Sequence, residues 1–397
     1  MLASKPGVCF VGQVVYRKPL NQTEAKRLKT LSELAEVYTI AFSDSLKPRI
    51  LRGEAKLYLL PNPRNTPLKF MIQATLGYAV LLALILRGRI SIIIAQSPVD
   101  GFTCALAKCT VAFFRRKTAL VIENHSDYRE SLFLQREVGF RRLYRWSIEK
   151  VALFSSKRAD AFRAVSSETQ EQLQRLAKER PIIRFIAWTD IDAFAEAYSN
   201  IELEAKSQQV ICFVGVLIPI KGVEYLLEAF GMIQNLFEGA FLEIIGPKLN
   251  HRYCLELEHK TRAMGLEGRV IFIDELPQDE LARRLARARA LVLPSLSEGL
   301  GRVIIEAMAC GVPVVCSSVG GIRDIVENGK TGFLVPPGDA EALAEKLEVL
   351  LRDRELALRM GEEARSRVEN LFSSQAYKEG YRRVFAAALK LAEEGRP

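Results

Sequence analysis

The feature that most constrains the fold is a short apolar segment that occurs twice. Val8-Cys-Phe-Val-Gly12 and Ile211-Cys-Phe-Val-Gly215 have nearly the same sequence and start the two halves of the 397-residue chain. Each reads as a buried strand that ends in glycine. A loop and a helical pattern follow each of them, over residues 23–34 in the first case and 222–230 in the second. The repetition predicts two domains that start in the same way.

Strand and helix patterns continue to alternate in both halves. Continuous apolar runs predict buried strands at residues 90–95, 119–123 and 161–165 in the first half, and at 241–246, 270–273, 290–294 and 312–316 in the second. Such runs, joined by helical connections, are typical of parallel sheets that are covered on both faces. The predicted fold class is therefore α/β, with two Rossmann-like domains whose parallel sheets face each other across a cleft.

The boundary between the domains is expected near residue 190. We assign residues 1–190 to the first domain and 191–375 to the second. A helical pattern over 375–391 follows a break at Phe372-Ser373-Ser374. Residues 376–397 are therefore expected to cross back and pack on the first domain.

The cysteine content and the start of the chain bear on the compartment. Seven cysteines are present, and none of them forms a CxxC motif or a Cys/His pair. An odd number of mostly apolar-flanked cysteines favours neither a disulfide framework nor a structural zinc site, and suits a reducing compartment. The first seven residues lead directly into a strand pattern and do not resemble a signal peptide. These observations predict a cytoplasmic protein.

Charge is distributed unevenly along the chain. The net charge is +9, but residues 1–190 contain 31 Lys and Arg against 16 Asp and Glu, whereas the remainder contains 25 and 31. The basic half is compatible with solvated helix faces, with an anionic membrane surface or with an acidic acceptor. Nucleic acid is not an expected partner, because aromatic residues are sparse between the basic clusters and no nucleic-acid-binding motif is present.

One uncharged stretch is long enough to require a membrane test. Residues 70–86 carry no charge and lie at the lower length limit for a helix that spans a bilayer. The stretch contains Gln73, Thr75 and Gly77, and Arg87 follows it directly. A buried helix, or one that lies on a membrane surface, is favoured over a transmembrane span. Peripheral binding to the cytoplasmic membrane face therefore stays open.

The segment over residues 290–316 carries the strongest functional signal. An apolar strand ends at Pro294, a glycine-containing loop follows, and a helix is predicted to start near Arg302. Gly299 and Gly301 leave room for a ligand to approach the backbone. The backbone amides at the start of the helix are expected to bind a diphosphate without a metal. The residues predicted to form this site are Gly299, Leu300, Gly301, Arg302 and Val303.

Two carboxylates flank the start of this predicted helix. Glu298 precedes it, and Glu306 lies about one turn inside it. Two carboxylates that are set apart along one edge of a pocket can accept hydrogen bonds from two different polyol groups, such as a sugar and a ribose. In the structural alternative, Glu298 caps the helix and Glu306 lies at the surface. The surrounding strand–loop–helix pattern favours the functional interpretation.

Histidine is scarce, and one histidine has a notable position. His125 follows the apolar run 119–122 and is therefore expected at the carboxyl end of a parallel strand, where open α/β sheets bind ligands. The alternative is a local structural hydrogen bond. His251 and His259 lie in a polar helical pattern and are expected at the surface. Asp190-Ile-Asp192 is more compatible with the start of a helix than with a metal site, and no metal ligand is assigned.

The second half resembles the donor-binding half of retaining glycosyltransferases of family 4, which have the two-domain GT-B fold. The segments that carry the resemblance are Phe213-Val-Gly-Val-Leu-Ile-Pro-Ile-Lys221-Gly, Glu298-Gly-Leu-Gly, Glu306-Ala-Met-Ala-Cys-Gly-Val-Pro-Val-Val, Gly320-Gly321-Ile-Arg-Asp-Ile-Val and Asn328-Gly-Lys-Thr-Gly-Phe-Leu-Val-Pro-Pro. The resemblance covers residues 210–372 well. The first half resembles the family loosely, through Glu123-Asn-His125, Ala164-Val-Ser-Ser-Glu-Thr and Thr189-Asp-Ile-Asp-Ala-Phe.

The resemblance implies a role for each matched residue. Glu298 would hold hydroxyls of the donor sugar, and Glu306 would hold the ribose of the nucleotide. The amides of residues 301–303 would contact the phosphates, and Lys221 would neutralise the leaving diphosphate. His125 would lie close to the transferred sugar. The expected catalytic residues are thus His125, Glu298 and Lys221, and Gly12 and Gly215 join the expected substrate-binding residues.

The resemblance further implies a function. The substrate would be a UDP- or GDP-linked sugar, no other cofactor would be needed, and the acceptor would be a glycan or a lipid-linked molecule in cell-surface polysaccharide or glycolipid synthesis. The chain departs from the family pattern at Val216, where Arg is usual, and in the first loop, which reads Leu20-Asn-Gln-Thr-Glu24. These departures leave a non-catalytic or weakly active partner protein as the alternative. A phosphorylase or an epimerase of the same fold is less favoured.

Overall fold

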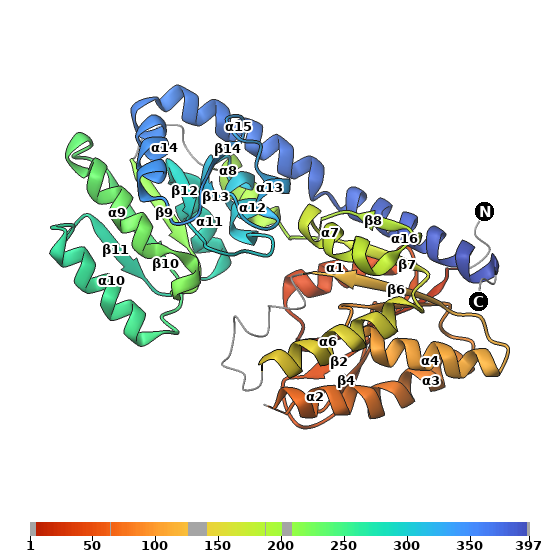
Figure 1. The fold of residues 1–397 in the computed structure, drawn as a ribbon. Helices are drawn as coiled ribbons and strands as arrows, with labels where there is room; N and C mark the ends of the chain where they lie inside the picture. The colour runs from red at the N-terminus through yellow and green to blue at the C-terminus, as the bar shows by residue number, and fades with distance from the viewer. Residues whose placement is uncertain (1–4, 64, 126–140, 187, 201–208, 395–397) are drawn as a thin grey trace. The chain divides into compact units, whose positions relative to one another are not determined.

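The computed structural model describes residues 5–63, 65–125, 141–186, 188–200 and 209–394. Residue contacts divide the chain into two units. The first unit comprises Met1–Trp188 together with Ser374–Pro397, and the second comprises Thr189–Ser373 (Figure 1). Each unit contains one sheet that is covered by helices, and each is described by itself below.

The first unit is built on an eight-stranded sheet with the order β3-β4-β2-β1-β5-β6-β7-β8. All neighbouring strands are parallel except β3, which forms an antiparallel edge with β4. The predicted strands β5, β6 and β7 are present, with ends that differ by up to two residues. The strands are β1 (Gly7–Tyr16), β2 (Glu36–Ser43), β3 (Arg49–Arg52), β4 (Lys56–Leu60), β5 (Ile92–Ala95), β6 (Ala119–Asn124), β7 (Ala161–Ala164) and β8 (Ile182–Arg184).

The sequence prediction that the first strand ends at Gly12 is wrong, because β1 continues to Tyr16. The backbone at Gly12 packs against Gln96, and a Cβ atom there would lie 2.0 Å from Gln96 Oε1. The pairing with β2 is irregular between Val11 and Val15 and then resumes. The glycine therefore makes room for a neighbouring side chain inside the sheet and does not end the strand.

Helices cover both faces of this sheet. One apolar core includes buried side chains of α3, α4 and α7, and the other includes side chains of α1 and α16. The helices of this unit are α1 (Gln22–Ser32), α2 (Thr66–Ile72), α3 (Tyr78–Leu86), α4 (Gly101–Phe113), α6 (Arg141–Ser156), α7 (Ser167–Ala177) and α16 (Ser374–Glu394). Helix α16 follows the second unit in the chain and packs against β5, β6, β7 and β8 of the first (Figure 1).

The uncharged stretch is helical and partly exposed. A π-helical turn, η1 (Gln73–Gly77), joins α2 to α3, so residues 66–86 form one helical run. Leu81 and Leu84 are buried in the core, whereas Leu68, Met71 and Leu76 are exposed. Among the described residues, Pro67–Leu86 is the one helical segment that is long and apolar enough to cross a membrane, and 28% of its apolar window is buried inside the protein.

The second unit is built on a six-stranded sheet with the order β11-β10-β9-β12-β13-β14. Every pair of neighbouring strands is parallel, as the continuous apolar runs predict. The strands are β9 (Val210–Val214), β10 (Phe241–Ile245), β11 (Val270–Ile273), β12 (Ala290–Leu293), β13 (Val314–Ser317) and β14 (Gly332–Val335).

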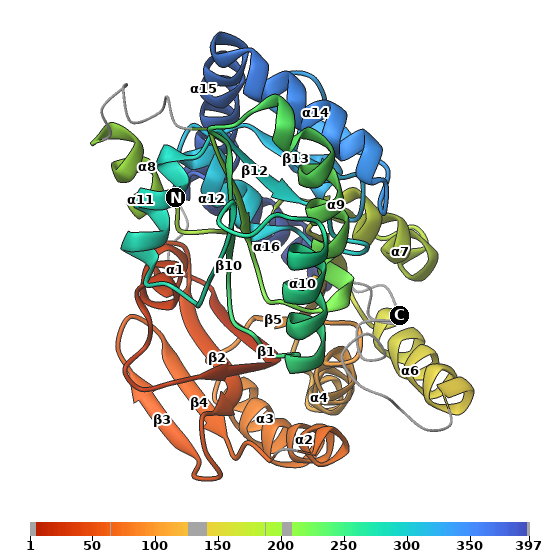
Figure 2. The same ribbon diagram turned by 90° about the vertical axis from the view of Figure 1, so that its left-hand side faces the viewer.

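Helices also lie on both sides of the second sheet. Helices α9, α10 and α14 contact one another on one side, and α8, α11, α12 and α15 contact one another on the other (Figure 2). These helices are α8 (Asp192–Ser199), α9 (Val223–Ile233), α10 (His251–Ala263), α11 (Gln278–Arg287), α12 (Arg302–Ala309), α13 (Ile322–Ile325), α14 (Ala340–Arg352) and α15 (Arg354–Leu371), with 3₁₀ turns at Pro219–Lys221 and Gln234–Leu236. Helix α8 starts at Asp192, whose amide donates to Asp190 Oδ1 (3.3 Å), as the helix-start interpretation predicts.

Candidate active site

The strand order of the second unit places two loops side by side. Strand β9 lies between β10 and β12, so connections on its two sides run in opposite directions. Ligands of open α/β sheets bind outside the carboxyl ends of the strands at such a switch point. Here the β9–α9 loop carries Lys221, and the β12–α12 loop carries Glu298. Both residues were predicted from the sequence to belong to one site.

The two loops are joined by a backbone bond and by an ion pair. The amide of Leu296 donates to the carbonyl of Ile220 (2.9 Å). The ammonium of Lys221 contacts Glu298 Oε2 at 2.5 Å, and Ser295 Oγ donates to the same carboxylate oxygen (3.3 Å). The side chains of Lys221 and Glu298 are 21% and 14% exposed, so both are largely desolvated but still accessible. A cation and an anion are therefore held together at the edge of the sheet.

The amino end of α12 is open next to Glu298. Gly301 precedes the helix with φ +71°, and no side chain caps the helix there. The first amides of an α-helix have no acceptor within the helix, and its dipole favours an anion at that end. Gly301 is required by this geometry, because the left-handed conformation disfavours other residues and a Cβ atom would lie 2.9 Å from Ile304 Cδ1. The predicted anion-binding amides are thus at a helix start, where the sequence placed them.

The second predicted carboxylate lies inside this helix. The Glu306 side chain is 14% exposed, and burial raises its pKa, while the charge of Arg302 opposes that shift. The guanidinium of Arg302 lies 3.8 Å from the Glu306 carboxylate. The alternative in which Glu306 is an ordinary surface residue is therefore not supported. A largely desolvated carboxylate can accept hydrogen bonds from a diol that replaces its lost hydration.

The remaining residues of the predicted phosphate site form the loops themselves. Gly215 directly follows β9, and its amide donates to the carbonyl of Ile245 (2.9 Å). Gly299 and Leu300 lie in the β12–α12 loop, and the carbonyl of Gly299 accepts from the amide of Gly321 (3.0 Å). Val303 lies in the first turn of α12. Val216, which follows Gly215 in the β9–α9 loop, adds no charge to this loop.

His125 and Gly12 belong to the first unit. His125 follows β6 at the carboxyl edge of its sheet, as predicted, and its side chain is 39% exposed. Its Nε2 atom lies 2.8 Å from Glu123 Oε2. The local hydrogen bond that was weighed as an alternative to a functional role is therefore present, and its partner is a buried carboxylate. Residues 126–140 lie outside the described part of the chain.

Other polar residues near His125 were not predicted from the sequence. Glu123, Arg163 and Tyr381 are almost fully buried and contact one another. A cavity of about 120 Å³ lies beside them and is lined in part by His125, Gln96 and Arg27. Glu123 could have been noticed as a charged residue that ends an apolar run. Arg163 and Tyr381 gave no such signal, because their partners are distant in the sequence.

A second buried polar group lies at the start of α4. Asp100 accepts from Gln73 Nε2 (3.1 Å) and from Ser97 Oγ (2.7 Å). Burial raises the pKa of Asp100, although these hydrogen bonds oppose the shift. Gln73 comes from the π-helical turn, a feature that often marks functional sites. Neither residue was assigned a role from the sequence.

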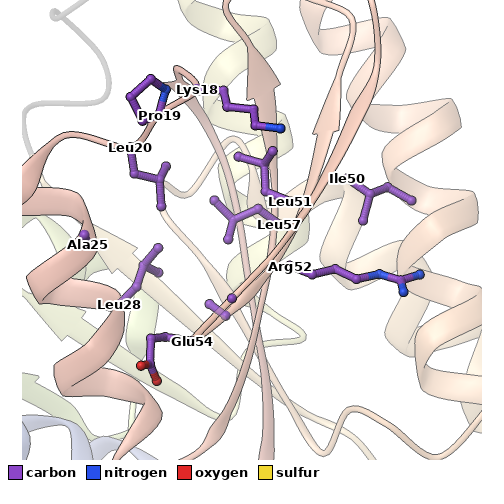
Figure 3. A pocket seen from close by; sticks show the side chains of 12 residues that line it. Lys18, Pro19, Leu20, Ala25, Leu28, Ile50, Leu51, Arg52, Glu54 and Leu57 are labelled. Atoms are coloured by element: carbon purple, nitrogen blue, oxygen red, sulfur yellow. The ribbon is translucent and has the colours of Figure 1, made fainter.

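The first unit also has a larger pocket, which the sequence did not reveal. It encloses about 380 Å³ between α1, the loop that precedes it, and the β3–β4 hairpin. Figure 3 shows Leu20, Leu28 and Leu57 lining it from these three elements, with Lys18 beside them. Arg52, the last residue of β3, and Glu54, from the hairpin turn, also line it. The pocket is therefore mainly apolar, with charged groups at its borders.

Two family descriptions match the chain. "Glycosyl transferases group 1" matches residues 194–367, and "Glycosyltransferase Family 4" matches residues 28–185. The capsular polysaccharide biosynthesis glycosyltransferase CapM of Staphylococcus aureus is 32% identical over 279 residues, which are 66% of this chain and 70% of that protein. The N-acetyl-alpha-D-glucosaminyl L-malate synthase of Bacillus anthracis is 28% identical over 257 residues, which are 63% of this chain and 65% of that protein.

Solved structures have the same fold. The sucrose-phosphate synthase from Thermosynechococcus elongatus superposes with a TM-score of 0.72 at 22% identity, and covers 97% of this chain and 100% of that chain. The Anabaena protein HepE, solved in complex with UDP, superposes with a TM-score of 0.73 at 19% identity, and covers 96% and 99%. The fold class is therefore GT-B. With both halves matched and the GT-B architecture established, the chain belongs to glycosyltransferase family 4 and is a glycosyltransferase.

Proposed function

We propose that this glycosyltransferase moves a sugar from a nucleotide-sugar donor to a glycan or lipid-linked acceptor, with retention of the anomeric configuration and without a metal. The observation that carries the proposal is the Lys221–Glu298 ion pair beside the open amino end of α12. This arrangement combines a cation and helix amides that no side chain of the described residues caps with a carboxylate that can accept from hydroxyl groups.

The second unit would bind the donor. The diphosphate would lie at the first amides of α12. There it would also draw the Lys221 ammonium away from Glu298 and pair with it. Released from its ion pair, the Glu298 carboxylate would accept hydrogen bonds from sugar hydroxyls. Glu306 would hold the ribose. The same ion pair thus keeps both side chains in place before the donor arrives.

Transfer breaks the bond between the anomeric carbon and the diphosphate, and negative charge grows on the leaving group. Lys221 and the α12 amides would stabilise that charge without reorganising, which is the largest contribution in many enzymes. The leaving phosphate would take the acceptor proton on the same face of the sugar, in line with the family resemblance. No side chain is assigned as a nucleophile, and the positive groups supplied by the chain itself support metal independence.

The first unit would bind the acceptor. Its pocket between α1 and the β3–β4 hairpin has a volume within the usual range for small-molecule sites and is lined mainly by apolar residues, of which four are leucines. An apolar lining with Lys18 and Arg52 at the border supports an acceptor that has an apolar part and an anionic group. His125 of the same unit would contact the transferred sugar.

We also propose peripheral binding of the first unit to the cytoplasmic membrane face. Leu68, Met71 and Leu76 on the 66–86 helical run are exposed, and the unit is rich in Lys and Arg. Exposed apolar side chains together with positive charge favour an anionic lipid surface. Co-sedimentation with vesicles that contain anionic lipid tests this part. Absence of binding at low salt would contradict the membrane proposal. Binding by a Met71→Ser, Leu76→Ser variant that equals wild-type binding would also contradict it.

A thermal-shift screen against nucleotide sugars tests the donor proposal. A UDP-linked sugar is the first candidate, because a structure with the same fold was solved with UDP-glucose, and GDP-linked sugars form the second panel. A donor that stabilises the wild type but not Lys221→Met supports the site. Product analysis by NMR then determines the anomeric configuration, and addition of EDTA tests metal independence. The proposal fails if no nucleotide sugar stabilises the protein.

Val216 supports a second candidate function, a nucleotide-sugar-binding partner that does not catalyse transfer. Valine there removes one cation that the family pattern has at the diphosphate. Binding of a nucleotide sugar without transfer or hydrolysis would favour this candidate. A Val216→Arg variant that gains activity would show that the missing cation limits the reaction.

A further inference from the structure

A buried carboxylate lies directly behind His125. Glu123 is 1% exposed and is the penultimate residue of β6, two residues before the histidine. Its Oε1 atom accepts from Arg163 Nη1 (2.9 Å) and from Tyr381 Oη (2.8 Å). Its Oε2 atom lies 2.8 Å from His125 Nε2. Both carboxylate oxygens are therefore used, and one of them faces the ring.

The charge of Glu123 decides which ring nitrogen carries a proton. Burial by itself raises the pKa of this carboxyl, but the Arg163 guanidinium and hydrogen bonds from His125 and Tyr381 outweigh burial and lower the pKa to about 2. The carboxylate is consequently ionised near neutral pH, and an ionised carboxylate only accepts hydrogen bonds. Nε2 of His125 must then carry a hydrogen. In the neutral ring, Nδ1 is left as the atom that can accept a proton.

We propose that Glu123 is a positioning residue that fixes the tautomer and the orientation of the His125 ring, and that Arg163 and Tyr381 hold it for this purpose. The inference rests on the proposed function, in which His125 contacts the reacting sugar. It assigns a role to three residues that were not among the predicted site residues. It also links α16 to the reaction, since Tyr381 lies on that helix.

The surroundings of Glu123 restrict its movement. The Arg163 guanidinium stacks on the Phe185 ring, 3.9 Å from its centroid, and Tyr381 packs edge-on against Phe185 at 5.1 Å. Arg163 is 1% exposed, and within the described residues its Nε and Nη2 atoms have no hydrogen-bond acceptor. Arg163 has therefore lost its hydration, and its bond to Glu123 replaces only part of it. Stability alone would not require a buried and incompletely paired guanidinium at this place.

A cavity lies next to the His125 ring. The cavity of about 120 Å³ beside Glu123 and Arg163 is also lined by His125. Arg27 and Tyr16 also line this cavity, and Arg27 donates a hydrogen bond to the Tyr16 hydroxyl. Glu123 is therefore the group that pairs with both Arg163 and His125 at this position. Because Glu123 contacts His125 directly, a change in the charge of Glu123 should change which nitrogen of the imidazole carries a hydrogen.

The first experiment measures the ring nitrogens directly. Two-bond ¹H–¹⁵N correlation spectra of the ¹⁵N-labelled full chain identify which nitrogen of a histidine carries the hydrogen. Only three histidines are present, so the signal that disappears in His125→Ala belongs to His125. We expect a hydrogen on Nε2 in the wild type. In Glu123→Gln, the amide oxygen should stay with Arg163 and its NH₂ group should face the ring, which moves the hydrogen to Nδ1. A wild-type ring without a hydrogen on Nε2 would overturn the proposal.

The second experiment separates positioning from folding by kinetics. Glu123→Gln should lower kcat by about 100-fold, the scale on which misplacing a group at the reacting sugar acts, while KM for the donor stays within about twofold because the variant leaves the second unit unchanged. Tyr381→Phe keeps the ring and loses one hydrogen bond to Glu123, so kcat should fall by less, about three- to tenfold. A folded Glu123→Gln variant with wild-type kcat would overturn the proposal.

A matched control and a second readout cover the remaining outcomes. Tyr78→Phe also removes one buried hydroxyl contact, with Thr110 (2.8 Å), and lies on α3 away from this network; its kcat should stay at the wild-type value. If Glu123→Gln does not fold, the proposal is tested by kcat of Tyr381→Phe and by the position of the hydrogen on the wild-type His125 ring. If the wild type transfers no sugar, the proposed function fails, whereas the ring-nitrogen measurement still confirms or rejects the Glu123–His125 geometry.

Discussion

The two units assemble their polar residues in different ways. In the second unit, Lys221 and Glu298 come from adjacent loops, and their surroundings are mostly backbone amides and glycines. In the first unit, Glu123, Arg163 and Tyr381 come from two strands and from a helix that follows the other unit in the chain. A site made of backbone can be recognised from a contiguous sequence, whereas one made of side chains from distant elements cannot.

Electrostatics differ between the units as well. Burial raises the pKa of Glu123, but the charge of Arg163 together with the hydrogen bonds from His125 and Tyr381 outweighs burial and lowers the pKa to about 2. The pKa of Glu306 is raised, because burial outweighs the charge of Arg302. The first carboxylate contacts Arg163, Tyr381 and His125, whereas the second has a 3.8 Å ion pair with the exposed side chain of Arg302. This contrast is what we expect if Glu123 supports a side chain and Glu306 awaits a ligand.

The largest effect is expected for Lys221→Met, which keeps the aliphatic part of the side chain and removes the charge. Transfer activity should fall by about 10²- to 10³-fold, because a preorganised group at the leaving phosphate is lost. Initial rates at saturating acceptor measure it. Lys260→Met is the control. Lys260 on α10 forms an ion pair with Glu228 on α9, and removal of the Lys260 charge should leave the rate unchanged. Similar rates for Lys221→Met and the wild type would place the diphosphate elsewhere.

His125→Ala tests the first unit on the same scale. Turnover should fall by about 100-fold, the usual contribution of a positioned imidazole, while the melting temperature changes by only a few degrees because the side chain is partly exposed. His259→Ala on α10 provides a matched control with an exposed histidine. Equal turnover in the wild type and in His125→Ala would remove His125 from the site and leave the second unit as the sole source of the predicted chemistry.

Glu306→Gln should separate binding from stability. Affinity for the nucleotide should fall by about tenfold, because a charged acceptor for the ribose becomes neutral. Stability should rise at neutral pH. Because its pKa is raised in the folded state, ionisation of Glu306 disfavours folding. The wild type therefore loses stability as pH rises through that pKa. The variant has no carboxyl group to ionise at this position and should not lose stability in this way. Calorimetric titration and urea unfolding at several pH values measure both. A variant that is less stable at neutral pH contradicts the ligand role assigned to Glu306.

The smallest effect is expected for Gly301→Ala. The left-handed conformation and the contact with Ile304 should lower the free energy of unfolding by about 1–2 kcal/mol, and the shift of the α12 amides should weaken nucleotide binding. Gly268→Ala is the matched control, because Gly268 has φ +79° and no neighbour within 4 Å of its Cβ position. Both variants should lose stability, but only the first should lose affinity. Equal affinities would show that the start of α12 does not bind the nucleotide.

The second unit was predicted from the sequence almost completely. Five of its six parallel strands and the start of α12 at Arg302 follow from apolar runs and glycine positions that act locally. Strand β14 was not predicted, and the GT-B fold was implied by the family resemblance. Glu298 and Lys221 were both identified, but their ion pair was not, because a contact between two loops depends on the strand order.

The first unit was predicted less well. Its β3–β4 edge was missed, since the short strand Arg49–Arg52 has no apolar run. The end of β1 was placed at Gly12, because glycine usually interrupts a strand and the packing of Gln96 against it is a tertiary feature. His125 was identified from its position after β6, whereas Arg163 and Tyr381 acquire their significance only from residues that are far away in the chain.

Helix α16 has a consequence for the order of events during synthesis. It covers one face of the first sheet with Tyr377, Tyr381, Val384, Phe385 and Ala388, yet the ribosome must first add residues 189–373. At common elongation rates of about 5–20 residues per second, this takes roughly 10–40 s. During that interval the nascent first unit presents an uncovered apolar surface, so its maturation depends on chaperones or on a slow final docking of α16.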